Sequence, residues 1–133
     1  MSVERLNSIQ DKVNEIIQTK QLKITTKIIA VTKTFSPDKI IPLLDKGHIH
    51  YGENKIQESE EKWPALKEKY KNVQLHMVGK LQSNKAKKAV KLFDYIHSLD
   101  SIKLASKISQ YEKELNKKVK LFIQINLGEE NQK

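Results

Sequence analysis

Ile28-Ile29-Ala30-Val31-Thr32-Lys33 is an apolar run that ends in a lysine, and Thr34-Phe35-Ser36-Pro37-Asp38 follows it directly. The run predicts a buried β-strand, while Ser36 and Pro37 suit the N-cap and the first position of a helix. α/β folds build their functional sites at the carboxyl ends of parallel strands. A lysine amine that is partly withdrawn from water there loses its proton more easily and attacks a carbonyl carbon to form a Schiff base. Lys33 is therefore the first candidate site residue.

Outward from this strand, apolar residues recur in patterns that alternate between strand and helix. Residues 3–17 have the three- and four-residue spacing of an amphipathic helix, and Gly47 is placed to end the helix that begins at Pro37. Pro64 is expected to kink or split the helix over 54–70. The other predicted elements are strands over 48–52, 73–78, 95–99 and 119–127 and helices over 84–92 and 102–115.

This order of elements is one helix followed by strands that alternate with helices. Such alternation means parallel strands joined by right-handed helical crossovers. The strand starts recur roughly every 20–25 residues, which is the spacing of a (β/α)8 barrel, but an open doubly wound sheet has the same alternation. The pattern predicts an α/β fold and leaves these two arrangements open.

The composition narrows the class of protein. The chain has 133 residues, which suffices for one domain with a hydrophobic core. It contains no cysteine, which excludes disulfides and thiolate metal sites within it, and no run of 18 apolar residues that could span a membrane. Residues 1–5 lack the apolar segment of a secretory signal, so we expect a cytoplasmic protein with no membrane partner.

The formal net charge is +9, from 25 basic and 16 acidic residues. A charge of this size is typical of nucleic-acid-binding proteins. Arg5 is the single arginine, however, although arginine is the usual bidentate partner of guanine and phosphate. The lysines stand beside glutamates, as in Glu58-Ser59-Glu60-Glu61-Lys62, which favours solvated helix faces. A basic nucleic-acid-binding protein is kept as an alternative.

Two further segments combine polar residues at predicted strand ends. In residues 51–58 (YGENKIQE), Gly52 lets the backbone approach a ligand and Asn54 is placed to hydrogen-bond a bound group, although a turn and a helix cap also explain both. In residues 76–85 (HMVGKLQSNK), His76 precedes a glycine and a polar turn into a helix N-terminus, which attracts anions. A hydrogen-bonded core histidine is the competing interpretation. No carboxylate or cysteine ligand set accompanies the histidines, so no metal is expected.

Taken together, residues 30–34 (AVTKT), 51–58 and 76–85 resemble the pyridoxal phosphate homeostasis protein family, whose fold matches the N-terminal domain of alanine racemase. The resemblance extends over essentially the whole chain. It implies a (β/α)8 barrel that binds pyridoxal 5'-phosphate (PLP). It also implies a monomer that serves PLP homeostasis without established catalytic turnover, so it is not an enzyme, with PLP-dependent apo-enzymes as acceptors of the cofactor.

The same resemblance assigns individual residues. It implies that Lys33 holds PLP as a Schiff base, that Asn54 and His76 lie beside the cofactor, and that Lys133 lies near the pocket entrance. Two positions near the mouth depart from the family pattern. Phe35 stands where many relatives carry a second lysine, and Lys80 stands where many carry proline.

Length is the largest departure. Family members continue through three more strands, which carry the phosphate-binding loops, as expected for barrels that hold phosphate after their seventh and eighth strands. We therefore expect residues 1–133 to form a single, C-terminally truncated PLP-binding barrel domain with an N-terminal helix, about five strands and four connecting helices. Such an open piece should be unstable or aggregate alone. A PLP-dependent racemase or decarboxylase is the enzyme alternative, but it would need an acid–base residue on the opposite face of the PLP ring.

Overall fold

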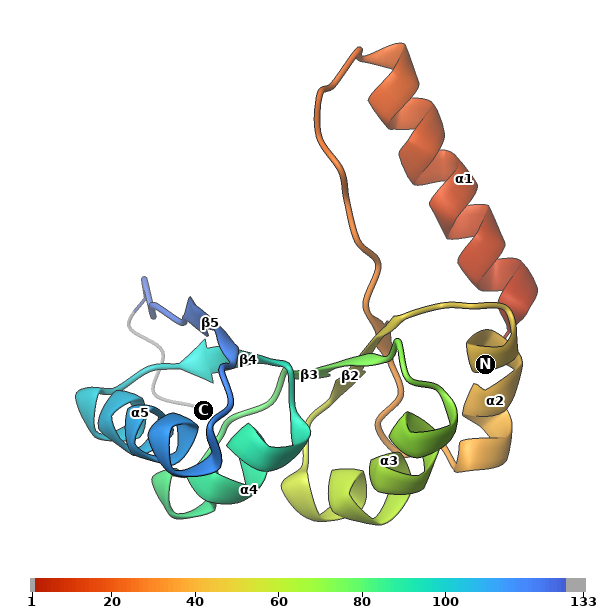
Figure 1. Ribbon diagram of the computed structural model, residues 1–133. Helices are drawn as coiled ribbons and strands as arrows, with labels where there is room; N and C mark the ends of the chain where they lie inside the picture. The colour runs from red at the N-terminus through yellow and green to blue at the C-terminus, as the bar shows by residue number, and fades with distance from the viewer. Residues whose placement is uncertain (1, 129–133) are drawn as a thin grey trace.

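The computed structural model describes residues 2–128, which form a parallel sheet and the helices around it (Figure 1). The chain begins with helix α1 (Val3–Thr19). The strands that follow are β1 (Ala30–Val31), β2 (His50–Glu53), β3 (Gln74–Met77), β4 (Tyr95–Leu99) and β5 (Lys120–Ile123). The helices between them are α2 (Pro37–Asp45), α3 (Ile56–Lys69), α4 (Ala86–Leu92) and α5 (Ile102–Leu115), and a 3-10 turn, η1 (Ser83–Lys85), precedes α4.

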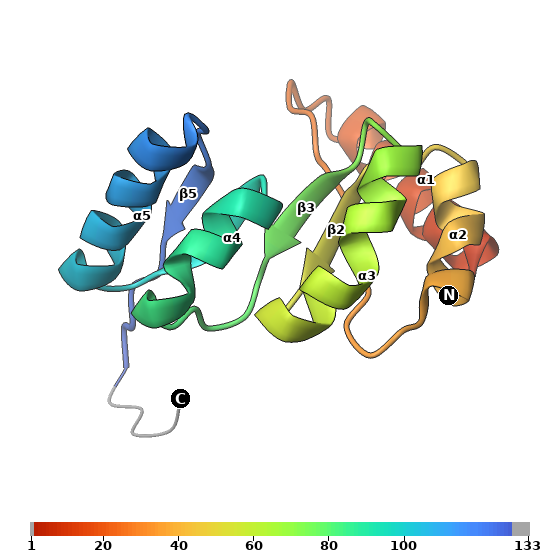
Figure 2. The ribbon, with the colours of Figure 1, turned by 60° about the horizontal axis from the view of Figure 1, so that its bottom comes forward.

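The strands are all parallel and lie in the order β1-β2-β3-β4-β5, so each strand pairs with the next one along the chain. A doubly wound sheet reverses its order at a switch point, whereas a barrel wall adds each new strand at the same edge. Figure 2 shows α2 to α5 side by side on one face of the sheet, as crossovers of one hand require. The fold is therefore an incomplete (β/α)8 barrel, which decides between the two arrangements that the sequence allowed.

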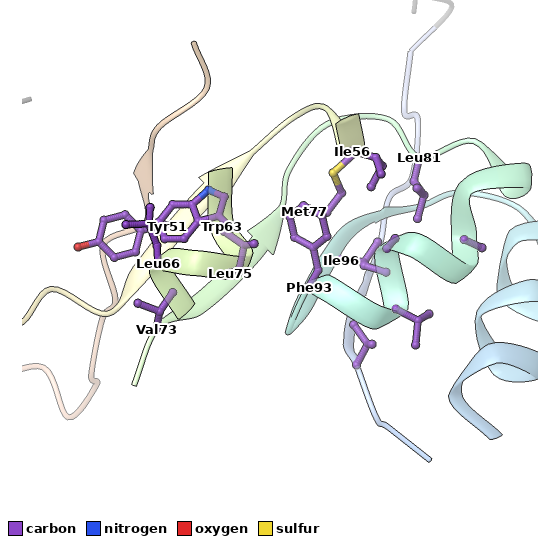
Figure 3. Close-up of a cluster of buried hydrophobic side chains, with 14 of the residues drawn as sticks. Tyr51, Ile56, Trp63, Leu66, Val73, Leu75, Met77, Leu81, Phe93 and Ile96 are labelled. Atoms are coloured by element: carbon purple, nitrogen blue, oxygen red, sulfur yellow. The ribbon is translucent and has the colours of Figure 1, made fainter. Parts of the chain in front are cut away.

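The hydrophobic core fills the space between the sheet and α2 to α5 (Figure 3). Trp63 of α3 is fully buried, and its ring centroid lies 5.1 Å from that of Tyr51 on β2. Farther along the sheet, Met77, Phe93 and Ile96 are buried together in the same layer. Burial of each large apolar side chain stabilises the fold by about 1.5–3 kcal/mol. The core thus holds α2 to α5 against one face of the sheet. The opposite face of the sheet, which these helices do not cover, is here called the inner face.

Helix α1 is the least integrated element. Figure 1 shows it standing away from the sheet, on the other side of the strands from α3 and α4. No residue of α1 is buried, and Ile9 and Ile16 are each 52% exposed. Only its first turns approach the core, where Val3 and Leu6 are partly buried.

Local signals in the sequence predicted several element ends. Gly47 follows α2 with φ +88°, a left-handed conformation that glycine adopts without strain, and Ser101 caps α5 by accepting a hydrogen bond from Leu104 N–H at 3.1 Å. Two expectations were wrong. α3 continues through Pro64 as one helix instead of splitting there, and only two residues of the strand expected over 28–33 pair with a neighbouring strand.

Candidate functional site

The segments that follow β1, β2 and β3 meet at the carboxyl edge of the sheet. The pairing register places Val31 opposite Gly52 and Gly52 opposite His76. Lys33 follows β1 by two residues, Asn54 comes directly after β2, and His76 lies within β3. Lys33 is exposed and Asn54 is half-buried. Three of the residues expected to surround a ligand therefore lie toward the same end of the sheet.

Glycine allows the strand ends to approach one another closely. A Cβ atom on Gly79 would lie 2.6 Å from the backbone oxygen and 2.8 Å from the Cα of Asn54, which is closer than real Cβ contacts. On the inner face, a Cβ atom on Gly52 would lie 3.1 Å from Ile29 and 3.4 Å from Val78. The loop after β3 thus packs directly on Asn54 and fixes its backbone, a role of Gly79 that the sequence did not predict.

A row of three histidines crosses the inner face beneath the mouth. His50 Nδ1 lies 2.9 Å from His76 Nε2, and His76 Nδ1 lies 2.8 Å from His97 Nε2. The ring of Tyr95 stacks on that of His76, with centroids 4.1 Å apart and planes 9° apart. Both ring nitrogens of His76 are therefore hydrogen-bonded to neighbouring rings, so this residue can support a ligand by packing but not by a free ring nitrogen.

The histidine row is held in its neutral form. Burial, together with the proximity of His97 and His50, lowers the pKa of His76 to about 4. Burial also lowers the pKa of His50 and of His97. A neutral imidazole offers one N–H donor and one acceptor nitrogen, which is what each ring-to-ring hydrogen bond requires. Among residues 2–128 no group of three metal-binding side chains has metal-site geometry, so the row is a hydrogen-bonded chain.

A buried ionic cluster lies behind Lys33, on the helix-covered side of the sheet. The Lys62 ammonium lies 3.0 Å from Glu53 Oε2, and these two side chains are 5% and 0% exposed. Trp63 Nε1–H also donates to Glu53 Oε2, at 3.1 Å, and Thr32 Oγ1 donates to the same oxygen. Sequence reasoning missed this cluster because it placed Lys62 on a solvated helix face. The one local signal was the position of Lys62 beside Trp63, on the apolar stripe of α3.

Three hollows near the carboxyl edge of the sheet are all lined by the same basic side chain, that of Lys80. Lys80, in the loop after β3, lines a pocket of about 290 Å³ with Asp100 and Asn126, and a pocket of about 410 Å³ with Asn54. It also lines a wider hollow of about 800 Å³ that reaches α5. Lys33 lines none of these three, and Lys133 lies outside the described residues. Of the three candidate residues within the described part of the chain, Asn54 alone lines one of these three hollows.

The sequential strands and the single helix-covered face define a barrel-type α/β protein, a class that builds its sites at the carboxyl ends of the strands, where the exposed Lys33 follows β1. No helix within residues 2–128 combines the length and the apolar character that crossing a membrane demands. No family model matches the chain.

Curated relatives and solved structures match it along most of its length. It is 32% identical to the pyridoxal phosphate homeostasis protein of Pasteurella multocida over 135 residues, which cover 100% of this chain and 58% of that protein. It is 40% identical to the protein of the same name from Synechocystis over 114 residues, covering 86% of this chain and 51% of the relative. The solved structure of PipY from Synechococcus elongatus without PLP has a TM-score of 0.77 and 36% identity, covering 90% of this chain and 56% of PipY. PipY with PLP bound matches with a TM-score of 0.73, 34% identity and coverage of 87% and 55%.

The chain therefore belongs to the pyridoxal phosphate homeostasis protein family. It spans about half the length of the curated relatives it matches, which fits the N-terminal part of such a protein.

Proposed function

We propose that this chain binds PLP through a Schiff base on Lys33 and serves PLP homeostasis without catalytic turnover. The observation that carries the proposal is the place of Lys33, an exposed lysine at the carboxyl end of β1 in a chain similar to a protein solved with PLP bound. An exposed amine is accessible to the aldehyde of PLP, and PLP supplies an electrophilic carbonyl and a conjugated ring that absorbs visible light. The residues present therefore fit the aldehyde end of the cofactor.

The neighbouring residues have proposed supporting roles. Asn54, held by its contact with Gly79, would offer its side-chain amide at the level of Lys33. His76 would close the floor of the site, since its ring is packed against Tyr95 and its nitrogens are engaged. Lys133, which is placed by the family resemblance alone, remains a predicted entrance residue.

The wider assignments are also proposals. Residues 1–133 would form a single piece of a PLP-binding barrel, in which further strands cover the inner face and supply phosphate-binding loops. All four residues of the edge strand β5 are exposed, which supports this arrangement because a further strand could pair there and cover them. We propose that the barrel with its inner face covered is a cytoplasmic monomer that exchanges PLP with PLP-dependent apo-enzymes.

Borohydride trapping tests the proposal. The chain is mixed with PLP, the visible absorption is recorded, the adduct is reduced with borohydride, and the modified lysines are mapped by peptide mass spectrometry. We expect the label to concentrate on Lys33 and to be lost in Lys33→Ala. The matched control is Lys39→Ala, which removes an exposed lysine of α2 and should leave the labelling unchanged. A label spread evenly over the chain's lysines would contradict the proposal.

A further inference from the structure

The backbone around Lys33 receives little support from the sheet. β1 has two residues, and its pairing with β2 ends at Val31 and Gly52, followed by one hydrogen bond from Thr32 N–H to Gly52 O at 2.9 Å. Within residues 2–128, β1 is an edge strand whose strand neighbour is β2. Lys33 therefore lies just beyond the last hydrogen bond of the ladder, and other contacts must fix its position.

Residues 32–35 form a tight turn around this lysine. Phe35 N–H donates to Thr32 O at 3.1 Å and closes the turn. Thr34 has φ +67°, in the left-handed region. A residue that is not glycine keeps such a conformation only where the surrounding contacts enforce it. The turn therefore depends on contacts from outside itself.

Two side chains one turn apart on α3 supply those contacts. Glu58 Oε1 accepts a hydrogen bond from Thr34 N–H at 2.6 Å. Lys62 Nζ donates to Thr32 O at 2.9 Å and to Phe35 O at 3.0 Å. The backbone on both sides of the candidate lysine is thus bonded to α3 from the helix-covered side of the sheet.

Lys62 is itself fixed by charge. Its side chain is 5% exposed and lies 3.0 Å from Glu53 Oε2 and 3.1 Å from Glu58 Oε1. A buried ammonium that has two carboxylate partners and two carbonyl acceptors has no alternative position of comparable energy. The contacts that Lys62 makes to the turn are therefore rigid.

We propose that Glu58 and Lys62 are positioning residues that direct Lys33 toward PLP. They act through the turn 32–35, which they hold from behind, so that the Lys33 amine is presented at the mouth of the inner face. This pre-organisation distinguishes Lys33 from exposed lysines on helix surfaces, such as Lys39 of α2 and Lys87 of α4. The inference rests on the proposed function, because it assigns these two residues to the same site.

Glu58→Ala in the 133-residue chain tests the inference, since Glu58 is partly exposed and its removal spares the core. Glu61→Ala is the matched control, an exposed glutamate on the same helix. The first readout needs no PLP: amide hydrogen exchange at Thr34 and Phe35. The second is the share of borohydride-trapped PLP on Lys33.

In Glu58→Ala we expect the Thr34 amide to exchange about tenfold faster, as the loss of one charge-assisted hydrogen bond implies. We also expect the share of label on Lys33 to fall by a similar factor, while Glu61→Ala matches the wild type in both readouts. Glu58→Gln should lie between them, because its amide oxygen still accepts from Thr34 N–H but pairs less strongly with Lys62.

Two results would overturn the inference. One is wild-type exchange and wild-type labelling in Glu58→Ala; the other is faster exchange throughout the sheet, including β4, which would indicate general destabilisation. Scattered label in the wild-type protein would instead overturn the proposed function, and the exchange readout would still decide whether Glu58 holds the turn.

Discussion

His76 is the residue whose surroundings differ most from those of a solvated side chain. It is 3% exposed, it is hydrogen-bonded to His50 and His97, and it is stacked on Tyr95. The sequence showed that these histidines lie on successive strands. It did not show that their rings come within hydrogen-bonding distance of one another, because that depends on the pairing register of three strands separated by helices.

Acidification should destabilise the protein through this row. The pKa of His76 is about 4 in the folded protein and near 6.5 in an unfolded chain, so between these values the unfolded chain binds more protons. The stabilising contribution is complete above about pH 6.5 and is lost as the pH falls toward 4, with about 2 kcal/mol gone by pH 5. Urea unfolding at pH 7.5, 6 and 5, followed by the fluorescence of the single tryptophan, Trp63, measures this loss.

The control for that experiment is His76→Gln. It removes the titrating group and keeps a polar side chain, so its free energy of unfolding should be lower at pH 7.5 but should change less between pH 7.5 and 5. Equal pH dependence in the variant and the wild type would show that other groups are responsible.

At the scale of elements, the carboxyl ends of the strands are held by loops and helices more than by the sheet. β4 occupies Tyr95–Leu99, the range that the sequence predicted for it, whereas β1 is much shorter than its apolar run. Apolar pattern predicts which segments are buried, but the number of residues that pair depends on the neighbouring strand. The burial of Lys62 likewise could not be predicted from the sequence, because a lysine beside glutamates on a helix has the pattern of a solvent-exposed helix face.

Gly79→Ala should disturb the site at this scale. The added Cβ would lie 2.6–2.8 Å from the backbone and Cβ of Asn54, so the loop after β3 must move away, at a cost of about 1–3 kcal/mol. We expect a lower melting temperature and a smaller share of PLP label on Lys33.

Gly47→Ala is the comparison for this variant. No atom lies within 4 Å of its added Cβ, so it bears only the backbone cost of φ +88°, about 1 kcal/mol. It should lower the melting temperature without changing the labelling of Lys33. If both variants change labelling equally, the contact between Gly79 and Asn54 has no specific role at the site.

At the scale of the whole molecule, one sheet face lacks α2 to α5, and the edge strands β1 and β5 each pair on one side only within the described residues. Phe122 is 52% exposed and Ile123 is 73% exposed, both on β5. The ring of Phe122 stacks on His97, with centroids 4.5 Å apart, so the apolar surface continues into the histidine row. Exposed strand edges and apolar patches of this kind favour association between chains.

The 133-residue chain alone should therefore associate as its concentration rises. Sedimentation or light scattering over a range of concentrations measures this, and Phe122→Lys should weaken the association by placing a charge on the exposed strand. Ile102→Lys is the control, since Ile102 is 87% exposed on α5, away from β5. A chain that stays monomeric and unfolds cooperatively at all concentrations would contradict this expectation.

The sequential strand order also has a consequence for the time at which each part of the protein forms. Paired residues on neighbouring strands are separated by only 19–25 positions, from Ala30 with Tyr51 to Tyr95 with Lys120. Because each strand pairs with the one before it, pairing can proceed in chain order during synthesis. The contacts described for the turn that carries Lys33 involve no residue later than Lys62, so we expect this turn to form once α3 has left the ribosome, before β3, β4 and β5 are synthesised.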